Sequence, residues 1–179
     1  MTREKCVGID FGTSNSAVAL STNSKIQLIE AELGKFTQPS SIFIRADGYI
    51  STGSQAVGDF QSESGYNDGY HFIPSVKPGL SLRDYDGNVV RSTRRTENGR
   101  PITRFFPVEE LGGASIGKLK RRAEETIGSQ VSSVILGRPV FFSTDTELDR
   151  LAQLRLENAA KHAGFKHIRF VMEPVAAAM

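Results

Sequence analysis

The stretch that decides the fold is Cys6–Leu20, which reads CVGIDFGTSNSAVAL. Its two halves, Val7–Phe11 and Ala17–Leu20, place apolar or small residues at nearly every position, which is typical of buried strands. The intervening residues, Gly12–Asn15, combine glycine with hydroxyl and amide side chains, as tight turns between strands do. The pattern therefore predicts a β-hairpin close to the start of the chain.

The turn of this hairpin also has the chemistry of a phosphate site. Glycine lets the backbone approach a ligand closely, and successive N–H groups in a tight turn form an anion-binding concavity. Thr13 and Ser14 add hydroxyl donors, and Asp10 at the entrance is suited to hold a hydrated Mg²⁺ beside the same phosphate. We interpret the stretch as a phosphate-binding hairpin. The alternative is an ordinary hairpin that merely uses turn-forming residues.

Three familiar nucleotide motifs do not account for the stretch. The chain has no G-x-x-x-x-G-K-[ST] and no helical pattern directly after the turn, which excludes a P-loop, and G-x-G-x-x-G is also missing. Asp10-Phe11-Gly12 spells the D-F-G of protein kinases, but neither a glycine-rich loop before it nor an H-R-D accompanies it. The phosphate interpretation thus rests on the hairpin itself.

Composition limits the class of protein. A length of 179 residues suffices for one substantial domain or two small lobes, and a net charge of +2 gives no strong field toward nucleic acid or an anionic membrane. Five arginines between Arg91 and Arg104 lack interleaved stacking aromatics, so a solvated hairpin face is favoured over a nucleic-acid site. We expect neither a nucleic-acid nor a membrane partner.

The distribution of apolar residues and cysteine indicates a cytoplasmic protein. No apolar run approaches the length of about 18 residues needed to span a membrane, and the N-terminus lacks the apolar core of a signal peptide. The single cysteine, Cys6, excludes an internal disulfide, and three scattered histidines argue against a zinc site.

The rest of the chain alternates strand and helix patterns. After an irregular middle, from about Gln61 to Phe106, apolar residues recur at helical spacing in two long segments. Together, the predicted strands and helices indicate a mixed sheet with crossover helices, which is an α/β fold. The expected elements are strands at Lys25–Ala31, Ile42–Ile44, Val131–Leu136 and Ile168–Met172, a hairpin of Val89–Thr93 with Pro101–Phe106, and helices at Gly53–Phe60, Pro107–Gly128, Asp145–His162 and from Pro174 onward.

Several of these segments, in this order, resemble one protein family. VGIDFGTSNSAVAL resembles the first phosphate motif of the actin/Hsp70/sugar-kinase ATPase superfamily, and four further stretches resemble Hsp70 chaperones in particular. The R-P-V and E-P-V-A-A variants look most like divergent bacterial Hsp70-like proteins of the YegD type. The four stretches are FTQPSSIFI, FPVEELGGASIGKLKRRAEETIG, VSSVILGRPVFF and AAKHAGFKHIRFVMEPVAAAM.

The resemblance implies an actin-like ATPase (ribonuclease H-like) fold: a mixed five-stranded sheet with flanking helices and a small inserted α+β subdomain. It assigns 1–37 and 113–179 to subdomain IA and 38–112 to the inserted subdomain IB. The D-L-G-G-G-T phosphate motif and the glycine-rich adenosine motif of a second lobe do not occur in the sequence. We therefore expect the chain to be lobe I of the ATPase, with lobe II absent from it.

The resemblance also gives roles to matched positions. Asp10 corresponds to the acid that orients Mg²⁺ through water, and Glu173 to a second acid holding Mg²⁺-bound water; the alternative for Glu173 is a helix N-terminal acid. Lys77 falls where the family places its catalytic lysine, with a solvated surface lysine as the alternative. The turn that wraps the β- and γ-phosphates is formed by Gly12, Thr13, Ser14 and Asn15. Pro139 matches a switch proline, for which Arg150 is the candidate relay arginine.

The implied function is that of the N-terminal ATPase lobe of an Hsp70-like molecular chaperone, with ATP or ADP and Mg²⁺ as cofactors. The parent protein would hydrolyse ATP to ADP and phosphate, whereas this chain alone would show little or no turnover. Lobe II of the same parent, unfolded polypeptide clients and co-chaperones are the implied partners. The alternatives are a sugar or small-molecule kinase of the same superfamily and a non-enzymatic scaffold or actin-like filament protein.

Overall fold

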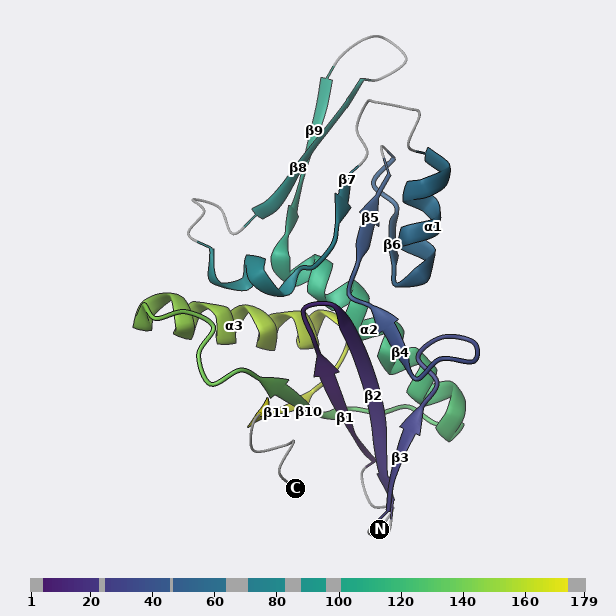
Figure 1. Cartoon of the computed structure of the whole chain (residues 1–179). Helices are drawn as coiled ribbons and strands as arrows, with labels where there is room; N and C mark the ends of the chain where they lie inside the picture. Colours follow the sequence, from purple (N-terminus) through teal and green to yellow (C-terminus); the bar gives the residue numbers. More distant parts are fainter. Residues whose placement is uncertain are drawn as a thin grey trace.

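The computed structural model describes residues 5–22, 25–45, 47–63, 71–82, 88–95 and 101–173. Their largest element is a mixed sheet in the order β11-β10-β1-β2-β3, with β4 paired to β2 (Figure 1). β1 is parallel to β10, and β10 to β11, whereas β1–β2, β2–β3 and β2–β4 are antiparallel. The strands are β1 (Cys6–Phe11), β2 (Asn15–Thr22), β3 (Lys25–Ile29), β4 (Thr37–Pro39), β10 (Ser133–Arg138) and β11 (His167–Met172).

The mixed α/β fold expected from the sequence is confirmed, with one strand more than the five expected. The additional strand is β4, whose three residues pair with Asn15, Ser16 and Ala17 of β2. Pro39 has no N–H to donate and signals a break in regular structure, yet proline is compatible with the end of a short edge strand. The helix expected from Pro174 onward lies outside the described residues.

The central strand β1 has two different faces. Val7, Ile9 and Phe11 are buried, and helix α2 (Val108–Ile127) contacts β1, β2 and β3. The alternate residues Gly8 and Asp10 lie on the opposite face, where small and apolar residues of neighbouring strands surround them. One face of the sheet thus supplies the core, and the described residues leave the other face open at a hollow beside Gly8 and Asp10.

Two helices begin and end where the sequence indicates. α2 follows Pro107, carries acids in its first turn, and ends at Gly128 in a left-handed conformation with φ 69°. Helix α3 (Thr146–His162) is capped by the Asp145 carboxylate, which accepts hydrogen bonds from the N–H groups of Glu147 and Leu148. α3 packs along α2 and closes the core.

A group of smaller elements, called the distal elements below, lies beyond the main sheet (Figure 1). A three-stranded antiparallel sheet, β6-β5-β7, packs against helix α1, and β8 pairs with β9 as the predicted hairpin. β7 was not expected from the sequence because it lies in the irregular middle of the chain, where apolar periodicity is poor. The distal elements are β5 (Ile42–Ile44), β6 (Ile50–Thr52), α1 (Ser54–Glu63), β7 (His71–Ile73), β8 (Asn88–Arg95) and β9 (Pro101–Pro107).

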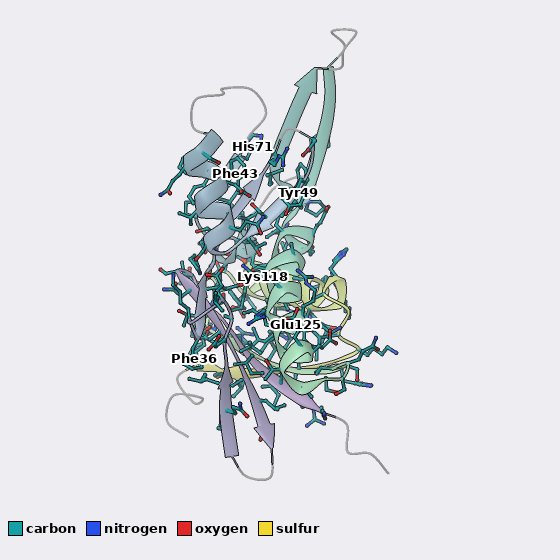
Figure 2. All side chains as sticks on the ribbon, turned by 90° about the vertical axis from the view of Figure 1, so that its right-hand side faces the viewer. Phe36, Phe43, Tyr49, His71, Lys118 and Glu125 are labelled. Carbon is teal, nitrogen blue, oxygen red and sulfur yellow. The ribbon has the colours of Figure 1, made fainter. Side chains whose placement is uncertain are left out.

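Glu32 connects the distal elements to α2. Its Oε1 accepts hydrogen bonds from the Ser54 N–H at 2.8 Å and from Lys118 Nζ at 2.7 Å, and Lys118 also donates to the Thr52 carbonyl at 3.0 Å. Figure 2 shows Lys118 between the main sheet and the distal elements. Burial acts to raise the pKa of Glu32, but hydrogen bonds from Lys118 and Ser54 outweigh it and lower the pKa. The ionised carboxylate is therefore the form that holds this contact.

None of the described helices has the length and apolarity required to cross a membrane.

Glycines set how closely α2 approaches α3, which gives a first prediction. A Cβ on Gly113 would lie 2.7 Å from His162 Cβ and 3.1 Å from the Ala159 carbonyl oxygen. We expect Gly113→Ala to destabilise the chain by about 1–3 kcal/mol because the two helices would have to separate. The matched control is Gly58→Ala in α1, where nothing lies within 4 Å; helix propensity predicts a gain of up to about 1 kcal/mol there. Urea unfolding of both variants measures the difference, and a stabilised Gly113→Ala chain would contradict the close packing.

Candidate functional site

The β1–β2 turn is open to solvent and its shape depends on Gly12. Thr13, Ser14 and Asn15 are exposed, so their hydroxyl and amide groups are available to a ligand. A Cβ at position 12 would lie 2.1 Å from the carbonyl oxygen of Asn15. Any other residue would force the turn open, so the tight turn requires glycine.

Ser40, directly after β4, fixes the same turn. Its hydroxyl donates to the Gly12 carbonyl oxygen at 2.7 Å, and its N–H donates to the Ser14 carbonyl oxygen at 2.9 Å. Ser16 Oγ lies 3.0 Å from Ser40 Oγ; since the Ser40 hydrogen is used on Gly12, Ser16 is the donor in that contact. Both serines are 1% exposed. Sequence reasoning gave Ser40 no role, because nothing local indicates that it meets a turn 28 residues earlier.

Three charged side chains from distant parts of the chain meet near this turn. Asp10 belongs to the last residues of β1, Lys77 opens the 3₁₀ helix η1 (Lys77–Ser81), and Glu173 directly follows β11. Lys77 Nζ lies 2.5 Å from Glu173 Oε1. The Lys77 side chain is only 10% exposed, against 36% for Glu173. Lys77 thus points inward as a buried cation rather than outward as a solvated surface lysine.

Arg155 on α3 holds η1 in position. The guanidinium donates from Nη1 to the carbonyl oxygens of Leu80 at 3.0 Å and Leu82 at 2.8 Å, and the residue is 5% exposed. A buried arginine that satisfies carbonyl groups at the end of a short helix anchors that helix firmly. The sequence did not predict η1, because five residues containing proline and glycine show no helical period.

Asp10 and Glu173 lie side by side in one hollow. Both line a hollow of about 490 Å³ on the open face of the sheet, together with small and apolar residues. Partial burial, followed by the negative charge of Glu173, raises the pKa of Asp10 above its usual 3.8, against the opposing effect of Lys77. Together, the Asp10 and Glu173 carboxylates and the Lys77 ammonium group carry one net negative charge at the carboxyl ends of β1 and β11 when all three are ionised.

This set of donors fits a magnesium ion that keeps most of its water. Among the described residues no group of three or more acidic, histidine or cysteine side chains could enclose a metal. Mg²⁺ is usually bound through one or two carboxylates plus water and substrate phosphates, rather than by an all-protein cage. Asp10 and Glu173, beside a turn with free hydroxyl donors, match that arrangement.

Arg138, at the end of β10, organises the loop that contains Pro139. Its Nη2 lies 3.1 Å from both carboxylate oxygens of Asp149 on α3, and its Nε donates to the Pro139 carbonyl oxygen at 3.0 Å. A hydrogen bond from the Phe142 N–H and the Arg138 guanidinium lower the pKa of Asp149. Arg150, the candidate relay arginine, is exposed. Arg138 therefore joins the Pro139 loop to α3, a contact that sequence reasoning missed.

Comparison with known proteins agrees with this architecture. The family model described as "Hsp70 protein" matches residues 6–65 and 82–179. Lys77 lies in the interval that the family model does not match.

Two curated relatives carry the name "Chaperone protein DnaK". They come from two strains of Halobacterium salinarum, and each is 30% identical over all 179 residues of this chain. The chain spans 25% of the length of each of these relatives. With most of its residues matched by the family model, this chain belongs to the Hsp70 family.

Proposed function

We propose that this chain is lobe I of the nucleotide-binding domain of an Hsp70-like molecular chaperone and binds the phosphates of ATP or ADP together with Mg²⁺. The observation that carries the proposal is the meeting of Asp10, Lys77 and Glu173 beside the Gly12–Asn15 turn. These groups come from the two ends and the middle of the chain, and a fold without a ligand there would gain little from placing two carboxylates together. The family match favours this function over that of a sugar kinase.

Each group has a distinct task in the proposed site. The N–H and hydroxyl groups of the turn donate hydrogen bonds to phosphate oxygens, in the manner of other anion-binding turns. Asp10 and Glu173 accept hydrogen bonds from water around the cation and so fix its position. Mg²⁺, when bound, neutralises charge that develops on the phosphates. Lys77, held by Glu173 and by η1, places a positive charge where the terminal phosphate and an attacking water would meet.

The activity of the whole protein requires more than this chain. In the parent we propose hydrolysis of ATP to ADP and phosphate between lobe I and a second lobe, coupled to opening and closing of the lobes. Unfolded polypeptides and co-chaperones are the proposed partners of the parent. We assign 1–37 and 113–179 to subdomain IA and 38–112 to subdomain IB. Within the family, we propose that the chain is of the YegD type, because its R-P-V and E-P-V-A-A variants resemble those proteins.

Nucleotide binding is tested by NMR titration of the ¹⁵N-labelled chain with Mg-ATP. We expect the amide signals of Gly12–Asn15 to shift with a Kd of about 1 mM, or about 4 kcal/mol, because only the phosphate side of the nucleotide would be held. Asp10→Ala and Lys77→Ala should each reduce the shifts. The control Lys161→Ala removes an exposed lysine on α3 and should leave them unchanged.

Two results would contradict the proposal. Shifts that avoid the turn, or that persist unchanged in Asp10→Ala, would exclude the turn and Asp10 as the phosphate and magnesium site. Micromolar binding that is lost in Asp10→Ala would instead contradict the division of the nucleotide site between two lobes.

The electrostatics of Asp10 predict a conflict between binding and stability. Because its pKa in the folded chain is raised above 3.8, its favourable contribution to stability is complete below pH 3.8 and is lost as the pH rises through the raised pKa. We expect Asp10→Asn to unfold at a higher temperature than the wild type at pH 7 without Mg²⁺, while losing Mg-ATP binding. The gain should disappear below pH 3.8 in thermal unfolding followed by circular dichroism. An Asp10→Asn chain that is less stable at pH 7 would show that the ionised carboxylate has a stabilising structural role.

A further inference from the structure

Gly137 is the residue of β10 that faces the two carboxylates. It precedes Arg138 and pairs with Val171 of β11. A Cβ built on Gly137 would lie 3.4 Å from Glu173 Cγ, and 3.9 Å from both Glu173 Oε1 and Asp10 Oδ1. Both the Asp10 and the Glu173 side chains thus lie close to the position that a Cβ of residue 137 would occupy.

The backbone does not explain a glycine at this position. Gly137 lies inside a regular strand, and its φ is outside the left-handed region in which glycine is favoured. Glycine inside a strand lowers stability relative to alanine, and it marks places where a ligand or another backbone comes close. Among the described residues, the atoms nearest to this position belong to the Asp10 and Glu173 side chains and not to another backbone segment.

We propose that Gly137 is a specificity-determining residue of the cation site, in that its missing side chain leaves room for the water shell of a divalent cation between Asp10 and Glu173. This inference rests on the proposed function and adds a residue to it. A hydrated cation binds through waters that occupy the space around the carboxylate oxygens, so the volume in front of Gly137 sets how many waters fit. A methyl group there would displace water that the two carboxylates otherwise orient.

The chain tolerates this methyl group sterically. Contacts of 3.4–3.9 Å are ordinary van der Waals distances, so Gly137→Ala requires no movement of Glu173 or Asp10. Alanine and valine are also better strand residues than glycine, so neither substitution should lower stability through the backbone. The variants therefore change the cation space without removing a charge or a hydrogen bond.

The experiment measures Mn²⁺ binding to the full chain without nucleotide, from the electron paramagnetic resonance signal of free Mn²⁺. We expect weak binding in the wild type that is lost in Asp10→Asn, and about a tenfold weaker Kd in Gly137→Ala, equivalent to about one hydrogen bond. Gly137→Val should weaken binding further while its unfolding temperature stays equal or rises. The matched control is Gly8→Ala, which adds the same methyl on the same face of the sheet, with nothing within 4 Å.

Three results would overturn the inference: Mn²⁺ binding in Gly137→Ala as tight as in the wild type, equal weakening in Gly8→Ala, or no Asp10-dependent Mn²⁺ binding in the wild type. Because the ligand is the cation alone, the result is separate from nucleotide binding. A chain that failed to bind Mg-ATP, but lost Mn²⁺ affinity in Gly137→Ala and not in Gly8→Ala, would still support the role of Gly137.

Discussion

The strict alternation of side chains along β1 is the constraint on which the rest of the structure depends. Val7, Ile9 and Phe11 must face α2 because they are the apolar residues of the strand, and this fixes the register with both β2 and β10. Asp10 then has to emerge on the open face. A shift of one residue would bury the carboxylate and expose the core side chains, so the same apolar contacts that stabilise the sheet also place the acid.

The net negative charge of the site follows from this constraint. The fold brings a second carboxylate beside the first and supplies one buried ammonium group. Placing two carboxylates together costs free energy. The cation proposed above would lower that cost.

Elements with a local sequence pattern could be predicted, whereas the roles of residues that contact distant segments of the chain could not. The hairpin of β1 and β2 could be predicted from its apolar strands and its turn residues. The helices α2 and α3 could be predicted from apolar spacing, with a glycine at the C-terminal end of α2. Ser40 and Arg155 act on backbone atoms of segments that lie far away in the sequence, so nothing beside them indicates their role. The resemblance to the family suggested Asp10, Lys77 and Glu173 as site residues. The short helix η1, which buries Lys77, was not predicted because it has too few residues to show a period.

The two hydrogen bonds from Ser40 to the β1–β2 turn link hydrogen exchange at Ser40 to opening of the turn. Ser40 stands between β4, which belongs to the main sheet, and β5, the first of the distal elements, and it holds the turn through both its hydroxyl and its amide. The amide proton of Ser40 can exchange with solvent only when it leaves the Ser14 carbonyl, and that event also loosens the turn. A ligand that held the turn in this conformation would therefore slow hydrogen exchange of the Ser40 amide.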